Sequence, residues 1–192
     1  GGDVRRVVYG YYAGDAAGSN LKSAVIERWT GSAWEEVETK YFRYHDVESV
    51  GDNQGLLWLV LEDAAYRQAL YGLDVTGLDG VATGDLMAYA DRQYAYDATD
   101  RVCQVKRRGG KYVTSYDYYH KATPPTDLNH WAGRTTVTRP DGTVEKYYFN
   151  HAKQVILKQV LDGAETWNSY YQQFQAVTAR VTMEASKRIT RV

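Results

Sequence analysis

Residues 92–105 read RQYAYDATDRVCQV. Tyr94 and Tyr96 alternate with smaller residues before Asp97, and a second run of alternating residues starts at Arg101. Two short runs rich in aromatic and β-branched residues, separated by turn-forming residues, are typical of a β-hairpin. We therefore predict a strand on each side of this turn, with the Asp97 side chain closing it.

The same pattern recurs at residues 147–155, which read YYFNHAKQV. Asn150 takes the place of Asp97 and Gln154 takes the place of Arg101, and both can make the side-chain bonds to the backbone that a turn needs. Fainter copies are found at 41–46, 116–119 and 170–178. The later copies recur about every 20 to 30 residues, a spacing typical of repeat proteins.

These residues resemble the tyrosine–aspartate (YD) repeat family, also called Rhs repeats, whose motif is roughly GxxxRYxYDxxGRLxxV. The match is best over residues 92–105, where Asp100 stands in the position of the motif glycine, and it extends to about residue 181. It is weak over residues 4–46 and absent from 47–87. The structural repeat residues that the resemblance implies are Tyr94, Tyr96, Asp97, Arg101, Tyr147, Tyr148 and Asn150.

The resemblance implies a mainly β fold, a meander of antiparallel β-hairpins that forms a YD-repeat spiral or partial barrel. In the family, such sheets form hollow shells around a toxin or plug, or walls in bacterial surface proteins and in teneurin adhesion proteins. The repeat itself performs no chemistry. We therefore expect a non-catalytic structural module of a larger bacterial protein, secreted or at the cell surface. Its partners would be the rest of that chain or an enclosed or adjacent protein.

The remainder of the chain supports a single β domain over residues 1–192. A first strand is predicted at residues 4–12, and a hairpin at 24–29 and 34–44 turns around Gly31. In its second arm, alternation predicts that Val37, Thr39, Tyr41 and Arg43 share one face. Further turn signals at 108–110, 140–142 and 161–163 indicate that a hairpin meander follows, interrupted by a loop at 121–129.

Residues 47–91 are predicted to be a helix-containing insertion, with the helices themselves around residues 56–91. Apolar residues at helical spacing favour a helix over 62–70, with Gly72 as its C-terminal cap. Asp85 is predicted to cap a short helix that runs to about Ala90. The loop at 74–85 carries three aspartates and could bind calcium, although its spacing is not that of an EF-hand; the alternative is a solvated loop.

Composition limits the classes of function. The formal net charge is −1, which does not favour a nucleic-acid partner. No apolar run approaches the roughly 20 residues of a membrane span. The single Cys103 excludes an intrachain disulfide, and the spacing of the histidines fits no known zinc motif, so no metal or cofactor is predicted. The four histidines are His45, His120, His130 and His151.

The chain contains 18 Tyr and 5 Trp but only 3 Phe, which suits half-buried sheet faces. Trp29 and Trp34 flank one predicted turn and could form an exposed aromatic surface, so a carbohydrate- or protein-binding β module is the alternative function. A hydrolase is supported only by the abundance of carboxylates. We expect a monomer or a weak edge-paired dimer, because uncapped edge strands favour association whereas the charges in KRITRV oppose it.

Overall fold

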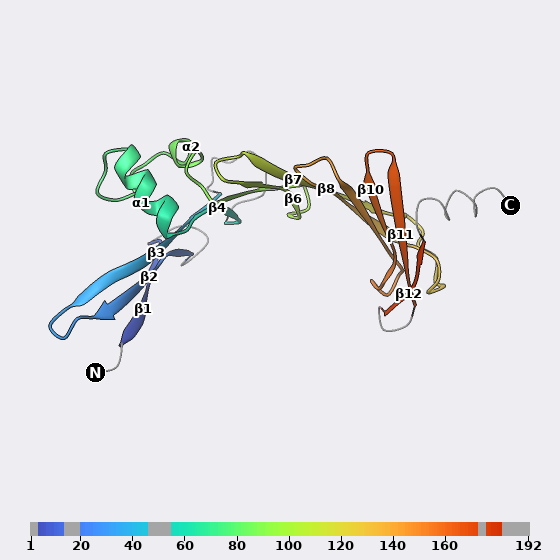
Figure 1. Cartoon of the computed structure of the whole chain (residues 1–192), viewed down its shortest axis with the longest axis horizontal. Coiled ribbons are helices and arrows are strands. Elements are labelled where there is room, and N and C mark those ends of the chain that lie inside the picture. Colours follow the sequence, from blue (N-terminus) through green and yellow to red (C-terminus); the bar gives the residue numbers. More distant parts are fainter. Residues whose placement is uncertain (1–3, 14–19, 46–54, 173–175, 182–192) are drawn as a thin grey trace. The chain divides into compact units, whose positions relative to one another are not determined.

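The computed structural model describes residues 4–13, 20–45, 55–172 and 176–181, and describes side chains as far as residue 169. The described part is mainly β, and its strands pair in the order in which they occur in the sequence (Figure 1). This is the predicted antiparallel meander. Its outermost strands do not pair with each other, so the sheet is not closed. The strands are β1 (Arg5–Tyr11), β2 (Leu21–Trp29), β3 (Trp34–Tyr44), β4 (Leu57–Leu61), β5 (Arg92–Tyr96), β6 (Val102–Arg107), β7 (Tyr112–His120), β8 (Gly133–Thr138), β9 (Val144–Phe149), β10 (Val155–Asp162), β11 (Glu165–Gln172) and β12 (Ala176–Val181).

The chain forms two compact units, Gly1–Val113 and Thr114–Val192, which we call unit 1 and unit 2. A single domain over residues 1–192 stays a prediction. The predicted charged strand end KRITRV lies outside the described residues, as does the first part of the predicted insertion.

Strand β4 was not predicted from the sequence. It pairs with β3 on one side and with β5 on the other, so the meander passes through a segment that we had assigned to the insertion. Leu59, Val60 and Leu61 are all buried. A short apolar run that is buried on both faces has no alternation, and periodicity alone does not distinguish it from a buried helix.

The helices of the described residues are α1 (Asp63–Gly72) and α2 (Thr83–Leu86). Asp63 lies in the first turn of α1, where a negative charge is favourable, and Arg67 donates to its carboxylate from one turn later. Ala65 and Ala69 lie one turn apart and are buried, so α1 turns a small-residue face inward.

Both predicted helix caps are wrong. Gly72 is the last residue of α1 and is followed by Leu73 in a helical conformation, whereas the left-handed conformation occurs at Asp74. A Cβ at position 72 would meet the hydroxyl end of Tyr89, so a larger residue there would displace the end of that side chain. Asp85 lies inside α2, which starts at Thr83 and ends before Ala90.

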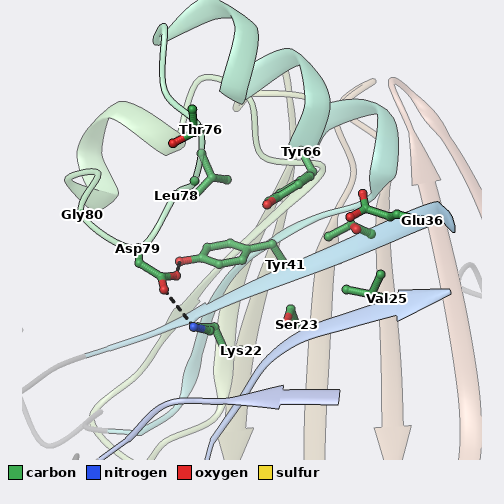
Figure 2. Close-up of a pocket in the computed structure, with 12 residues that line it drawn as sticks. Lys22, Ser23, Val25, Glu36, Tyr41, Tyr66, Thr76, Leu78, Asp79 and Gly80 are labelled. Atoms are coloured by element: carbon green, nitrogen blue, oxygen red, sulfur yellow. Dashed lines mark hydrogen bonds and ion pairs between the residues drawn. The ribbon is translucent and has the colours of Figure 1, made fainter. Parts of the chain in front are cut away.

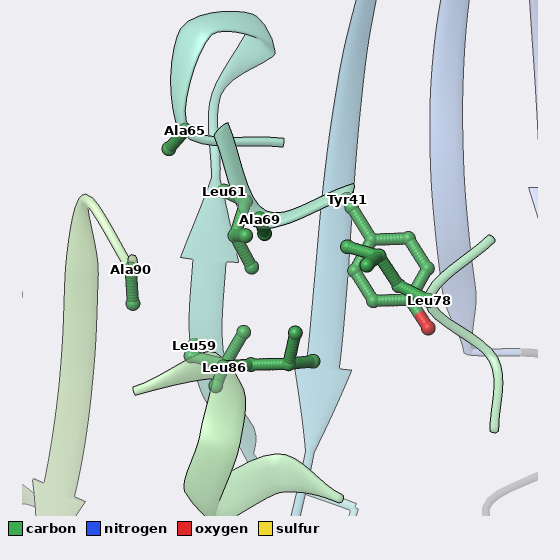
Figure 3. Close-up of a cluster of buried hydrophobic side chains, with 8 residues drawn as sticks. All are labelled: Tyr41, Leu59, Leu61, Ala65, Ala69, Leu78, Leu86 and Ala90. Carbon is green, nitrogen blue, oxygen red and sulfur yellow. The ribbon is translucent and has the colours of Figure 1, made fainter. Parts of the chain in front are cut away.

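The hydrophobic core of unit 1 lies between its sheet and the helical segment (Figure 3). Strand residues supply one side of this core, and the two helices with their loop supply the other. Each fully buried leucine contributes about 2 kcal/mol of hydrophobic stabilisation. The core residues are Tyr41, Leu59, Leu61, Ala65, Ala69, Leu78, Leu86 and Ala90.

The predicted face of Val37 in β3 is wrong, because a β-bulge lies at this residue. Ile26 pairs with Glu38 and Glu27 pairs with Glu36, so Val37 has no partner across the hairpin. Val37 is 40% exposed, whereas Thr39 and Tyr41 are buried as one face. Strict alternation therefore ends at the bulge, which places an extra residue in one strand.

Candidate functional site

The turn at residues 97–101 is closed by the side chain that the sequence predicted. The Asp97 Oδ1 atom accepts hydrogen bonds from the Thr99 and Arg101 amides at 2.9 and 3.1 Å. Its Oδ2 atom accepts one from the Arg101 guanidinium at 2.8 Å. Asp100 has a φ of 59°, which is the left-handed conformation that the motif glycine would adopt without strain. Desolvation raises the pKa of Asp97, but the bonds from Arg101 and Thr99 outweigh it and hold that pKa well below its usual value.

The turn at residues 150–154 has the same geometry. The Asn150 Oδ1 atom accepts from the Gln154 amide, and the Asn150 amide group donates to the Gln154 side chain, both at 3.0 Å. Lys153 has a φ of 60°, matching Asp100. In both turns the first amide donates to the fifth carbonyl, and the fourth amide donates to the first carbonyl. The two sequence copies are therefore also copies in backbone conformation.

The tyrosines that precede these turns pack against neighbours of several kinds. The Tyr96 hydroxyl donates to the Leu57 carbonyl at 2.8 Å, and its ring meets His45 edge to face. Tyr94 lies two residues earlier in β5, on the same face. Aligning the turns pairs Tyr94 with Tyr147 and Tyr96 with Phe149.

In the second copy, Tyr147 and Tyr148 are adjacent in β9 and therefore point to opposite faces. The Tyr147 hydroxyl donates to Glu145 at 2.8 Å. Tyr148 donates to Gln159 at 2.8 Å and contacts Trp131 edge to face. The residues directly opposite them in β8 and β10 are of other types, so these direct pairs do not form the Tyr–Tyr ladder that the resemblance implies.

The predicted aromatic surface consists of Trp29 and Trp34, which face each other across the β2–β3 turn. Their ring centroids are 5.5 Å apart, and the ring planes are tilted by 56°. The Arg6 guanidinium lies 4.3 Å from the Trp34 ring centroid. One face of Trp34 is thus occupied, and the two rings do not form a flat platform.

The other residues considered from the sequence are dispersed. Among the described residues, no group of three or more His, Cys, Asp or Glu side chains could hold a metal ion. Asp79 is paired with Lys22, and Asp85 lies in α2. Cys103 is a free, half-buried thiol in β6. Within the described ranges, no helix combines the length and apolar character needed to cross a bilayer.

A cavity in unit 1 was not predicted. It has a volume of about 400 Å³ and lies above β2 and β3, beneath the loop that follows α1 (Figure 2). Lys22 and Asp79 form an ion pair of 2.8 Å at one end, and Glu36 lies toward the other (Figure 2). The rings of Tyr41 and Tyr66 line it, with centroids 6.0 Å apart.

Charged and polar groups hold the loop above this cavity in place. The Arg43 guanidinium donates to three backbone carbonyls of the loop, those of Leu78, Asp79 and Val81. The Tyr41 hydroxyl donates to the Asp79 carboxylate at 3.2 Å. The Lys22 ammonium holds the pKa of Asp79 below its usual value, whereas burial raises the pKa of Tyr41. Asp79 is therefore ionised and Tyr41 protonated at neutral pH.

Sequence reasoning missed this cavity because its parts are far apart in the chain. Lys22 and Asp79 are separated by 57 residues, and nothing in either local sequence marks them as partners. The only local sign was a loop with several aspartates, which we considered for calcium. No known protein family matches the sequence, and a search of curated proteins also found no match.

Proposed function

We propose that this chain is a non-catalytic structural module of a larger YD-repeat protein, secreted or at the surface of a bacterium. Successive hairpins would form part of a β-wall or shell that encloses or contacts another protein. The observation that carries this proposal is the shared geometry of the turns at 97–101 and 150–154, with a left-handed residue at the motif glycine position in each.

The outer strand β1 supports the proposal from another direction. Among the described strands it pairs only with β2, and several of its large side chains are 40% exposed or more. An edge strand with apolar side chains favours pairing with a further strand. In a longer array, a neighbouring hairpin would cover this edge. The exposed residues are Val7, Val8, Tyr9 and Tyr11.

A turn exchange tests whether the two copies are equivalent. One variant carries NHAKQ at residues 97–101, and a second carries DATDR at residues 150–154. Because both turns use the same backbone conformation, each variant should keep the circular dichroism spectrum and the cooperative unfolding of the parent. A control that deletes Thr99 should lose both, since a one-residue change alters strand register. Unfolding of the exchange variants together with the control would contradict the repeat.

The exposed edge of β1 is tested by sedimentation velocity over a range of concentrations. We expect a monomer that associates weakly, and we expect Tyr9→Lys to abolish the association because a charge on an edge strand opposes pairing. The matched control is Tyr71→Lys, which places the same charge on the outside of α1. Association that is equally weakened by both variants would argue against edge pairing.

A carbohydrate- or protein-binding module that uses Trp29 and Trp34 is the second candidate. Trp29 is 40% exposed and offers a stacking surface, but Arg6 covers part of Trp34. This arrangement suits cross-strand packing better than ligand stacking. A glycan array decides the question: hits that disappear in Trp29→Ala would support this candidate, and hits that persist in both Trp29→Ala and Trp34→Ala would remove it.

A further inference from the structure

We propose that the cavity above β2 and β3 in unit 1 binds a neutral, polyhydroxylated ligand, namely a single sugar ring or the end of a short saccharide. The site is separate from the Trp29–Trp34 pair and does not depend on the proposed wall function. The argument has three parts: an unsatisfied hydroxyl, two aromatic rings and the balance of charge.

The unsatisfied hydroxyl belongs to Thr39, a residue that lines the cavity and is only 3% exposed. Its Oγ1 atom has no hydrogen-bond partner in the described part of the chain. Its backbone amide is satisfied separately, by the Asp63 carboxylate at 2.9 Å. The Oγ1 atom itself has almost no accessible surface, so the Thr39 side chain would have to rotate about its Cα–Cβ bond to present its hydroxyl to the cavity. A ligand hydroxyl that bonds to the rotated side chain would remove the cost of a buried hydroxyl without a partner.

Aromatic rings provide the apolar part of the site. Tyr41 and Tyr66 are tilted by 35° to each other and line the cavity between the sheet and α1 (Figure 2). The negative face of an aromatic ring attracts the C–H groups that line one face of a sugar. Arg43 lies 5.4 Å from the Tyr41 ring centroid, which leaves Tyr66 as the main stacking partner.

The charges of the cavity favour a neutral ligand. Asp79 is paired with Lys22 at 2.8 Å, and Glu36 is paired with Arg67 at 3.4 Å. An anionic or cationic ligand would have to compete with one of these ion pairs. A sugar hydroxyl does not, because an ionised carboxylate has further lone pairs that accept hydrogen bonds while its ion pair stays intact. The volume of about 400 Å³ lies in the range of small-molecule sites.

The test is a titration followed by amide chemical shifts. The probes are glucose, galactose, mannose and N-acetylglucosamine. Glucuronate and glucosamine, which have nearly the same size as glucose, serve as the anionic and cationic probes. We expect at least one sugar to cause saturable shifts at Val25 and residues 76–80, with a dissociation constant in the millimolar range, and we expect no saturation with the charged probes. Saturation by a charged probe alone, or by none of the probes, would overturn the proposal.

Two variants locate the binding. Thr39→Val should weaken sugar binding about 2- to 10-fold, the range of one neutral hydrogen bond, and Thr39→Ser should restore it. Thr39→Val has the same shape and loses no bond within the protein, so it should fold; Tyr66→Leu gives a second, independent loss of affinity. Tyr71→Ala is the control, since Tyr71 is 90% exposed and should leave affinity unchanged. Sugar binding that is unchanged in Thr39→Val and Tyr66→Leu would place the ligand elsewhere and refute the site.

Discussion

Unit 1 and unit 2 consist of the same kind of antiparallel hairpin, yet their sheets bury different side chains. Unit 1 covers one face with α1, α2 and the connecting loop, and this face buries leucines and alanines. Among the described side chains of unit 2, the buried apolar residue is Ala132, whereas the buried polar residues include Glu145 and Asn150. The turn geometry is nevertheless the same in both units. Turn conformation in this chain is therefore set locally, and packing is set by what lies over the sheet.

Truncation of a side chain in the apolar core of unit 1 should give the largest loss of stability. Leu59 is fully buried beneath the helical segment, so Leu59→Ala should lower the free energy of unfolding of unit 1 by roughly 3 to 5 kcal/mol. The matched variant in unit 2 is Val160→Ala, where a half-buried side chain should cost about 1 kcal/mol. Urea unfolding measures both, and equal losses would show that the two units do not differ in this way.

The second-largest loss of stability is expected from truncation of Tyr96, the repeat tyrosine of unit 1. Tyr96 packs on His45 and donates to the Leu57 carbonyl, so Tyr96→Ala should destabilise unit 1 by about 3 kcal/mol. Tyr96→Phe keeps the ring and should lose only about 1 kcal/mol, the contribution of one hydrogen bond. A loss below about 0.5 kcal/mol for the alanine variant would mean that Tyr96 is not a packed residue.

Removal of the buried carboxylate of Glu145 in unit 2 should cause a smaller loss of stability. Glu145 accepts hydrogen bonds from Arg139, Tyr147 and Lys158 at 2.9, 2.8 and 3.3 Å. Loss of a partner in a fully buried pair costs about 3 to 5 kcal/mol, but Arg139 and Lys158 retain contact with water, so Glu145→Ala should cost roughly 2 kcal/mol. Thermal unfolding tests this against Glu165→Ala, an exposed carboxylate whose loss should be nearly neutral.

The smallest expected effect is a difference in pH dependence between the turn that Asp97 closes and the turn that Asn150 closes. The pKa of Asp97 is lowered from its usual 3.8, so its stabilising bonds are fully present above about pH 4 and are lost as the pH falls toward the folded pKa. Asn150 does not titrate. On acidification, exchange of the Thr99 and Arg101 amides, corrected for intrinsic rates, should accelerate, whereas that of the Gln154 amide should not. Asp97→Asn should remove this difference, and a pH response that persists in it would assign the effect to another group.

Sequence alone was sufficient for most strands and for the turns that Asp97 and Asn150 close, because side-chain alternation and turn chemistry are local properties. It was not sufficient for β4, which is buried on both faces, or for the bulge at Val37, which depends on the pairing of two strands. Glu145 was also missed, since alternation does not show that a charged residue is enclosed by three partners.

The cavity was the least accessible feature. Thr39 and Tyr41 were correctly assigned to one face of their strand, but the loop that covers them is attached by the side chains of Lys22 and Arg43. These contacts join segments that are distant in the sequence, and the local sequence around either partner does not predict them. Local rules therefore gave the sheet and its turns, and tertiary contacts determined the candidate site.

The way this loop is attached also has a consequence for the order of assembly. Most neighbouring strands of the meander are close in sequence, so most of its hairpins close a short stretch of chain; the exception is the β4–β5 pair, which spans the helical segment. The Lys22–Asp79 contact closes 57 residues, at a greater entropic cost than a short hairpin. We expect the loop to dock after the rate-limiting step of folding. In stopped-flow experiments, Asp79→Asn should then accelerate unfolding and leave the refolding rate unchanged. A slower refolding rate would place this contact in the folding nucleus, and the hairpins would then assemble around the loop rather than before it.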